Sequence, residues 1–261
     1  MEVRVDDKVL LVTGAAQGLG RAVAVEAASS GAAAIVLTDR NTQRGEAVIS
    51  EIVKLGAKAA FVVGDLLEGD APGKIISAAI DQFGRLDGLV NAAGLSDRGS
   101  VATADPALFD RLFAVNTRAP MFLMQGLIRH LQERKAPGSI VNILSFQAHG
   151  AGVNLAIYGA TKAALSLLTK NAAFAHRRDR IRIFGINLGW ADTPGEREMQ
   201  AVKLGKGESW LADAEARMPW GRLINAEDVA RLTLFLLSDL SIPMTGALID
   251  QDQNSVLGVM G

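Results

Sequence analysis

Seven short stretches of the chain are almost wholly apolar, instead of alternating between apolar and polar positions. These runs occupy 8–14, 33–39, 58–65, 86–94, 138–145, 181–187 and 246–250. Continuous apolar runs of this length are typical of strands that are buried on both faces, as in a parallel sheet. The pattern therefore predicts seven strands in a sheet that is covered on both sides.

Longer stretches with helical character separate these runs. Two of them end at Gly31 and Gly56, where a glycine can close a helix. The expected helices occupy 19–31, 41–56, 74–83, 106–132, 156–176 and 226–238. Strands that alternate with crossover helices form a doubly wound, mostly parallel sheet with helices on both faces. The sequence thus predicts a single α/β domain over 1–261.

One long segment lies outside this alternation. Residues 190–222 connect the sixth and seventh expected strands and are rich in charge, glycine and tryptophan. A long connection of this composition suits a mobile cover over a site. We therefore expect 190–222 to cover a substrate.

Composition narrows the classes of function. With 27 basic and 28 acidic residues, the chain has no excess of positive charge that would favour binding to nucleic acid or to an anionic membrane. There is no cysteine and there are only three histidines, so thiolate chemistry is excluded and no metal site is expected. The densest basic run, HRRDRIR at 176–182, is interpreted as a solvated helix end. The start of the chain is unlike a signal peptide and no apolar run has membrane length, so a soluble cytoplasmic protein is expected.

A glycine-rich turn, TGAAQGLG, follows the first expected strand and opens a helix. Gly14, Gly18 and Gly20 would let backbone N–H groups approach a pyrophosphate at the helix N-terminus. The second strand ends at Asp39, about twenty residues further on, where an acidic side chain suits the two hydroxyls of an adenosine ribose. Asp39 would repel a 2′-phosphate, although Arg40 follows it directly. The turn therefore indicates a dinucleotide site, with NAD favoured over NADP.

Further motifs follow in a fixed order: GD at 64–65, NAAG at 91–94, VNT at 115–117, Ser145 thirteen residues before Tyr158, YGATK at 158–162 and NLGWADTPG at 187–195. Together with TGAAQGLG, they resemble the short-chain dehydrogenase/reductase family across essentially the whole chain. Ala92 and Leu188 depart from the family pattern, in which asparagine and proline are usual. The resemblance implies a Rossmann-type fold, a nicotinamide-dependent oxidoreductase and a homotetramer.

The resemblance also implies where the cofactor binds. Asp65 and Leu66 are expected at the adenine, and Thr193 is expected at the nicotinamide carboxamide. The full set expected to bind NAD is Gly14, Gln17, Gly18, Leu19, Gly20, Asp39, Arg40, Asp65, Leu66, Asn91, Ala92, Gly94, Tyr158, Lys162, Gly189 and Thr193.

Tyr158 is the only tyrosine in the chain and is the expected acid and base. Lys162 lies one helical turn later on the same face, and its positive charge is expected to lower the phenol pKa from about 10. The resemblance implies that Lys162 also holds the nicotinamide ribose. It further implies that Ser145 polarises the substrate carbonyl and that Asn116 holds a water linking Lys162 to solvent. The expected catalytic residues are therefore Asn116, Ser145, Tyr158 and Lys162.

The side chains expected around the substrate are unusually hydrophilic: Ser96, Arg98, Ser145, Gln147, His149, Asn154 and Trp190. They favour a small polar alcohol or carbonyl, namely a sugar, a polyol or a hydroxy acid, over a steroid. Arg98 could meet a carboxylate or be exposed, and His149 could be a substrate contact or a surface residue. The C-terminal run DQDQNSVLG could line a pocket or an interface. Two alternatives stay open: an NADPH-dependent carbonyl or 3-oxoacyl reductase, and a non-catalytic NAD(H)-binding sensor.

Overall fold

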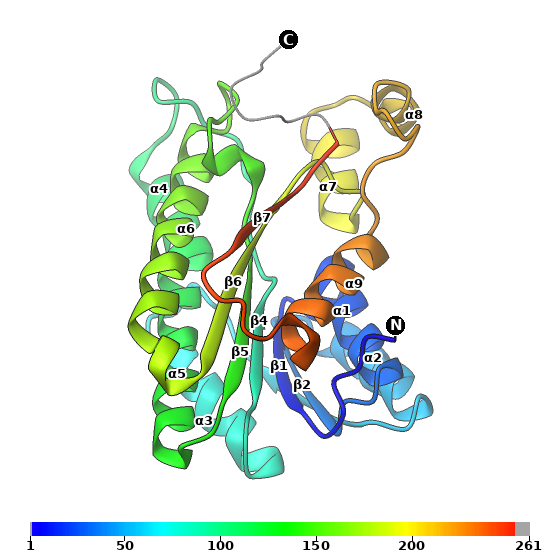
Figure 1. Cartoon of the computed structure of the whole chain (residues 1–261). Coiled ribbons are helices and arrows are strands. Elements are labelled where there is room, and N and C mark those ends of the chain that lie inside the picture. Colours follow the sequence, from blue (N-terminus) through cyan, green and yellow to red (C-terminus); the bar gives the residue numbers. More distant parts are fainter. Residues whose placement is uncertain (1, 254–261) are drawn as a thin grey trace.

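The seven predicted strands form one sheet in the computed structural model, which describes residues 2–253 (Figure 1). The sheet order is β3-β2-β1-β4-β5-β6-β7 and every neighbouring pair is parallel. The strands are β1 (Val9–Thr13), β2 (Ala34–Asp39), β3 (Lys58–Val63), β4 (Gly88–Asn91), β5 (Gly138–Ile143), β6 (Ile181–Leu188) and β7 (Leu248–Gln251). The order reverses direction between β1 and β4, which is where doubly wound sheets bind their ligands. The predicted doubly wound α/β fold is confirmed.

Two layers of helices cover the sheet, as expected from strands that are apolar on both faces. One apolar core joins the sheet to α1 (Gly18–Ser29), α2 (Thr42–Lys54) and α9 (Ala226–Leu237). The other joins it to α3 (Ala71–Phe83), α5 (Ala119–Arg134) and α6 (Ala156–His176). Figure 1 shows these two groups of helices on opposite sides of the strands. Gly31 and Gly56 follow the last residues of α1 and α2 with positive φ angles of 90° and 92°, so both predicted helix ends are confirmed.

The helix predicted over 106–132 is interrupted. It consists of α4 (Pro106–Phe113), a π-helical turn at Ala114–Arg118, and α5. Pro120 lies in the first turn of α5 and has no N–H to donate to the turn before it. A wider turn accommodates the missing donor, and Ala119 N–H instead bonds to the carbonyl of Ala114. This turn carries Asn116, so the interruption falls at a predicted site residue.

The segment 190–222 forms its own small layer at the carboxyl edge of the sheet. It contains α7 (Pro194–Glu198), a π-helical turn at Met199–Lys203, and α8 (Trp210–Glu215). Trp210, Ala214 and Leu223 form the buried centre of a separate apolar cluster, against which Trp190 packs. Figure 1 shows α7 and α8 beyond the end of the strands. The segment is therefore structured and lies where a cover would be needed.

The basic run 176–182 is only partly the solvated helix end that its sequence suggests. Arg177, Arg178 and Arg180 are exposed, but Arg182 lies in β6 with 12% of its side chain exposed. Its guanidinium donates to the carbonyls of Leu236 and Leu237, at 3.0 and 3.2 Å, and to the hydroxyl of Ser241. The last carbonyls of α9 lack partners within the helix, so Arg182 satisfies them. The interpretation is wrong for Arg182 because its strand carries it beneath α9.

We predict that Arg182→Met lowers the free energy of unfolding by about 2 kcal/mol, because Leu237 O loses its side-chain donor and Leu236 O keeps only the hydroxyls of Ser139 and Ser241. Chemical denaturation followed by circular dichroism measures the change. Arg178→Met removes the same charge from an exposed position and should change stability by less than about 0.5 kcal/mol. Equal effects of the two substitutions would contradict the capping role.

Candidate active site

A single elongated cavity of about 1180 Å³ opens at the carboxyl ends of the strands. It extends from the glycine-rich turn after β1 to the start of α6, and residues of the 190–222 segment form part of its wall. Most of the predicted site residues line it: Gly14, Gln17, Gly18, Leu19, Gly20, Asp39, Arg40, Asp65, Leu66, Ala92, Gly94, Ser96, Arg98, Ser145, Gln147, His149, Tyr158, Lys162, Gly189, Trp190 and Thr193. The fold therefore brings together the residues expected for cofactor, catalysis and substrate.

Three predicted site residues do not line this cavity. Asn91 is buried in β4 and donates to the Asn142 side chain at 2.8 Å, because its position in the strand points it into the sheet's core. Asn154 is exposed, and its carbonyl accepts a hydrogen bond from Gly99 N at 2.8 Å. It lies in the loop before α6, outside the lining of the cavity, and its predicted contact with a substrate stays a prediction. The third is Asn116.

Asn116 lies fully buried in the π-helical turn. Its Oδ1 accepts from Leu95 N at 2.8 Å, and its Nδ2 donates to Leu95 O at 2.8 Å and to Thr161 Oγ1 at 3.1 Å. These contacts fix the loop after β4 against α6. The side chain thus positions the cavity wall, and the water-holding role expected of Asn116 stays a prediction.

The glycine-rich turn is shaped for close backbone approach. Gly14 has φ +65°, and a Cβ added there would lie 2.8 Å from Ala93 Cα. A Cβ on Gly20 would lie 2.4 Å from the carbonyl oxygen of Gly14. Thr13 Oγ1 accepts hydrogen bonds from both Ala92 N and Ala93 N at 3.1 Å, which ties the turn to the end of β4. Only glycine fits the two positions, as a turn that presses backbone against backbone requires.

The N-terminus of α1 faces the same cavity. No side chain caps this twelve-residue helix, and its first turn holds no acidic residue. Its leading N–H groups and the positive end of its dipole therefore suit an anionic group. The turn and the helix together fit the pyrophosphate of a dinucleotide.

Charged side chains cluster at the adenosine end. Asp39 Oδ2 accepts from Ala16 N at 3.3 Å, and its Oδ1 accepts from Asn41 N at 3.1 Å. Arg40 lies 4.0 Å from the carboxylate of Asp65. A smaller, mostly polar cavity of about 570 Å³ adjoins them, lined by Ala16, Gln17, Asp39, Arg40, Asn41, Thr42, Arg44 and Glu198. The end of β2 therefore presents one acid and two arginines.

Sequence reasoning missed Arg44. It lies in the first turn of α2, four residues after Arg40, which precedes the helix, and its guanidinium donates to Gln17 Oε1. The signal available in the sequence was a second arginine close after the end of the second strand.

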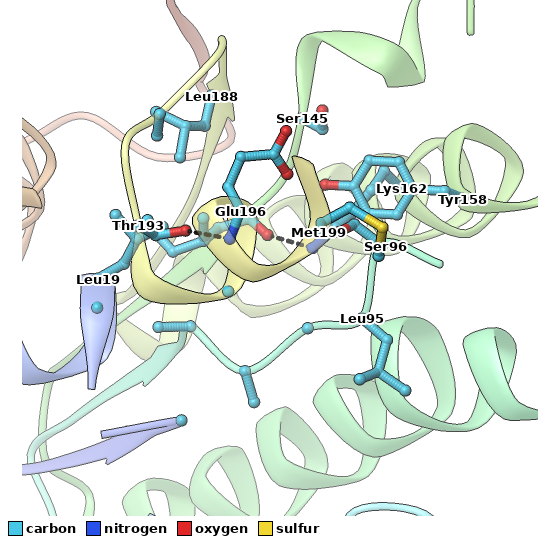
Figure 2. Close-up of a pocket in the computed structure, with 18 of the residues that line it drawn as sticks. Leu19, Leu95, Ser96, Ser145, Tyr158, Lys162, Leu188, Thr193, Glu196 and Met199 are labelled. Atoms are coloured by element: carbon cyan, nitrogen blue, oxygen red, sulfur yellow. Dashed lines mark hydrogen bonds between the residues drawn. The ribbon is translucent and has the colours of Figure 1, made fainter. Parts of the chain in front are cut away.

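Ser145, Tyr158 and Lys162 meet at the other end of the cavity (Figure 2). Ser145 follows β5, is 5% exposed, and hydrogen-bonds to the Tyr158 side chain. Tyr158 lies in the first turn of α6, and Lys162 lies one turn later. Lys162 is 4% exposed, and its Nζ donates to the carbonyl of Ile143 at 2.7 Å. A substrate oxygen beside Ser145 would find both a hydrogen-bond donor and a proton donor there.

The electrostatics of this group differ from the sequence expectation. Burial raises the pKa of Tyr158; the Ser145 hydrogen bond and the Arg98 charge oppose that rise, and the Glu196 charge adds to it. Burial lowers the pKa of Lys162 to about 8. The surroundings of Tyr158 in the protein alone thus raise its pKa, which is opposite to the direction expected from Lys162. The role of Lys162 toward the phenol in the presence of a cofactor stays a prediction.

Glu196, in α7, is a second residue that sequence reasoning missed. It lines the cavity with 14% of its side chain exposed, and Figure 2 shows its carboxylate near Ser145. Its Oε1 accepts from Trp190 Nε1 at 2.9 Å and from Gln200 Nε2 at 2.6 Å. Thr193 caps α7 by accepting from Glu196 N at 3.2 Å. The sequence signal was the Thr-x-x-Glu spacing of a helix start, which marks a cap and not a site.

His149 joins the cavity wall to the last strand. Its Nε2 lies 3.1 Å from Asp250 Oδ1 and 3.1 Å from Asn187 Nδ2, and Asn187 also donates to Asp250 at 2.7 Å. Asp252 lines the cavity, and Gln253 bonds to Trp220 N and Arg222 O. The first part of the DQDQNSVLG run therefore packs beside the site, and its remainder, 254–258, lies outside the described residues.

Two negative findings bear on other functions. Within residues 2–253, no three His, Asp or Glu side chains gather so that they could hold a metal ion. Over the same part of the chain, no helix combines the length and apolar character that crossing a membrane requires.

Comparisons with known proteins point in one direction. Residues 14–253 match the family model described as enoyl-(acyl carrier protein) reductase. The chain is 32% identical to the short-chain dehydrogenase/reductase FrzI of Cladobotryum sp, over 94% of each protein. It is 30% identical to a sorbitol dehydrogenase of Cereibacter sphaeroides, over 90% of this chain and 91% of the relative. The crystal structure of levodione reductase superposes with a TM-score of 0.89 at 28% identity, covering 96% of this chain and 98% of the other.

We predict that the tyrosinate absorbance of the folded protein titrates with a midpoint above that of free tyrosine, whose pKa is about 10, because burial raises the pKa of Tyr158. Since Tyr158 is the only tyrosine, a spectrophotometric pH titration reports it alone. Tyr158→Phe should abolish the signal, and circular dichroism must show a folded chain throughout. A midpoint at or below that of free tyrosine would show that Lys162 does activate the phenol without further groups.

Proposed function

The chain belongs to the short-chain dehydrogenase/reductase family, and from that premise we propose that it transfers a hydride between NAD(H) and a small polar secondary alcohol or carbonyl. As a member of that family it is an oxidoreductase that uses a nicotinamide cofactor. One observation carries the proposal. Ser145, Tyr158 and Lys162 meet at one end of a cavity whose other end holds the glycine-rich turn and Asp39.

Proton transfer falls to the Tyr158 hydroxyl. The nicotinamide ring, when bound, supplies the hydride acceptor or donor. In the reductive direction the phenol gives its proton to the substrate oxygen; in the oxidative direction it takes that proton back. The raised pKa of Tyr158 keeps the phenol protonated at neutral pH, which suits the reductive direction. Ser145 donates a hydrogen bond to the same substrate oxygen and stabilises the charge that develops on it.

Lys162 and the surrounding loops position the reacting groups. The hydrogen bond from its Nζ to Ile143 O anchors Lys162 between β5 and α6, within reach of a ribose held beside Gly94. Gly94 lies beside this amine, since a Cβ built on it would be in ordinary contact with the lysine Nζ, at 3.6 Å. We propose that Lys162 holds the ribose, and that Thr193, at the start of α7, holds the nicotinamide carboxamide.

The 190–222 segment is proposed as the substrate cover. It contributes Trp190, Glu196, Met199 and Gln200 to the cavity wall, and its own apolar cluster keeps it compact. The wall that it forms with Ser96, Arg98 and Gln147 is rich in hydrogen-bonding groups. That composition supports a sugar, a polyol or a hydroxy acid as substrate, and the similarity to a sorbitol dehydrogenase agrees with it.

Self-association is the remaining part of the proposal. Phe122, Leu167 and Phe174, on α5 and α6, are 40%, 70% and 67% exposed. Exposed apolar side chains on neighbouring helices favour contact with another subunit. They support the homotetramer that the family resemblance implies.

We predict that Tyr158→Phe binds NADH as the wild type does and loses turnover by about 100- to 10,000-fold, the usual contribution of a general acid. NADH fluorescence measures binding, and a panel of sugars, polyols and hydroxy acids with NAD, followed by absorbance, measures turnover. If the wild type binds NADH tightly and turns over no alcohol or carbonyl, the protein is instead a cofactor-binding sensor. Retained turnover in Tyr158→Phe would remove the acid role from Tyr158.

The proposed preference for NADH over NADPH depends on Asp39, whereas Arg40 and Arg44 would favour the 2′-phosphate of NADPH. We predict that the wild type binds NADH at least about tenfold more tightly than NADPH, because a carboxylate repels a 2′-phosphate. Asp39→Asn should reduce that ratio, while Asp81→Asn, which removes a charge from the exposed side of α3, should leave it unchanged. Tighter binding of NADPH by the wild type would favour the alternative, an NADPH-dependent carbonyl or 3-oxoacyl reductase, with the two arginines as its phosphate ligands.

A further inference from the structure

The substrate end of the cavity contains a carboxylate that the proton transfer does not use. Glu196 is largely buried, yet it lines the cavity, and Figure 2 shows its carboxylate on the same side as Ser145 and the Tyr158 ring. Its negative charge acts on the phenol of Tyr158. The acid therefore lies within electrostatic reach of the atoms that meet the substrate.

The protein uses only part of the acceptor capacity of Glu196. A carboxylate has about four lone-pair sites on two oxygens. The hydrogen bonds described for this carboxylate, from Trp190 and from Gln200, both end on Oε1, and the nearest cation, Arg98 Nη2, lies 3.5 Å from that same atom. Trp190 and Gln200 thus hold the carboxylate in place by one oxygen. The other oxygen is left to accept from a molecule in the cavity.

The nearby cations are already paired or bound. Arg98 faces Glu196 with one nitrogen and donates to Ser96 O with another, at 3.1 Å. At the cavity mouth, Lys203 lies 3.7 Å from Asp97. Lys162 donates to Ile143 O. A substrate carboxylate beside the second oxygen of Glu196 would therefore compete with Glu196 for Arg98, which already faces the first oxygen.

We propose that Glu196 selects neutral polyhydroxylated substrates, by accepting a hydrogen bond from a hydroxyl near the reacting carbon, and that it rejects hydroxy acids. The inference rests on the proposed function and narrows its substrate class to polyols and sugars. A hydroxyl gives the free carboxylate oxygen the donor it lacks, which is a charge-assisted hydrogen bond. A substrate carboxylate would instead place two like charges in one desolvated site.

The test compares substrates of equal length that differ in one charged group. For the wild type we expect kcat/KM with NAD to be higher for sorbitol than for gluconate, and higher for xylitol than for xylonate. In Glu196→Gln, which keeps the shape and an acceptor oxygen for Trp190, the polyol-to-acid ratio should fall at least about tenfold, since a neutral amide no longer repels the acid. Glu196→Asp keeps the charge and should keep the wild-type preference for the polyol.

Two controls separate recognition from a structural effect. Glu208→Gln removes an acid from an exposed part of the same segment, away from the cavity lining, and should leave the ratio unchanged. Glu196→Gln should also lower the midpoint of the Tyr158 titration, because it removes one of the influences that raise that pKa while Ser145, Arg98 and Lys162 stay in place. A merely structural role for Glu196 would lower activity on every substrate equally and leave the polyol-to-acid ratio where it was.

The outcomes distinguish this inference from the proposed function. Turnover of hydroxy acids in preference to polyols by the wild type, or an unchanged ratio in Glu196→Gln, would overturn the role of Glu196 and leave the oxidoreductase proposal standing. If the wild type turned over neither polyols nor hydroxy acids, and no other alcohol or carbonyl in the wider panel, both the role of Glu196 and the oxidoreductase proposal would be overturned.

Discussion

All seven strands run parallel, and this constraint decides where everything else can lie. Parallel strands end at one edge of the sheet, so the turn after β1, Asp39 after β2, the loop after β4 and Ser145 after β5 all reach the same cavity. The central strands β1, β2, β4, β5 and β6 are buried almost throughout, which leaves them little room for polar chemistry. The polar groups of the site therefore belong to strand ends, helix starts and the segment after β6.

Burial has two opposing effects on the group formed by Ser145, Tyr158 and Lys162. Burial holds Lys162 rigidly against β5 and places its amine near the cofactor's expected ribose. The same burial lowers the pKa of Lys162 and raises that of Tyr158, which opposes the formation of phenolate. The low-dielectric setting therefore favours a protonated phenol, and any stabilisation of phenolate must come from groups that join the site on binding. Burial thus sets the positions of these groups and most of their shift in proton affinity, while the charges of Glu196 and Arg98 add smaller shifts to Tyr158.

The charged side chains at the two ends of the cavity have different partners. At the adenosine end, Asp39 is held by backbone N–H groups while Arg40 and Arg44 lie beside it, so opposing charges sit close to one ligand group. At the end near Tyr158, Glu196 is held through Oε1 by Trp190 and Gln200, which belong to the same 190–222 segment. This segment thus brings its own charged group to the cavity wall.

The sequence by itself determined the strands, their parallel arrangement with crossover helices, and the position of the glycine-rich turn. Apolar runs and glycine spacing are local signals, so they can be recognised without the tertiary structure. It also identified Ser145, Tyr158 and Lys162 through spacing that a family shares. Only the tertiary structure decided that Asn91 bonds to Asn142 inside the sheet, that Asn116 is buried behind the cavity wall, that Arg182 caps α9, and that Glu196 lines the same cavity as Ser145 and Tyr158. Each of these depends on which element packs against which, and a side chain's burial and neighbours, hence its charge state, come from parts of the chain far away in sequence.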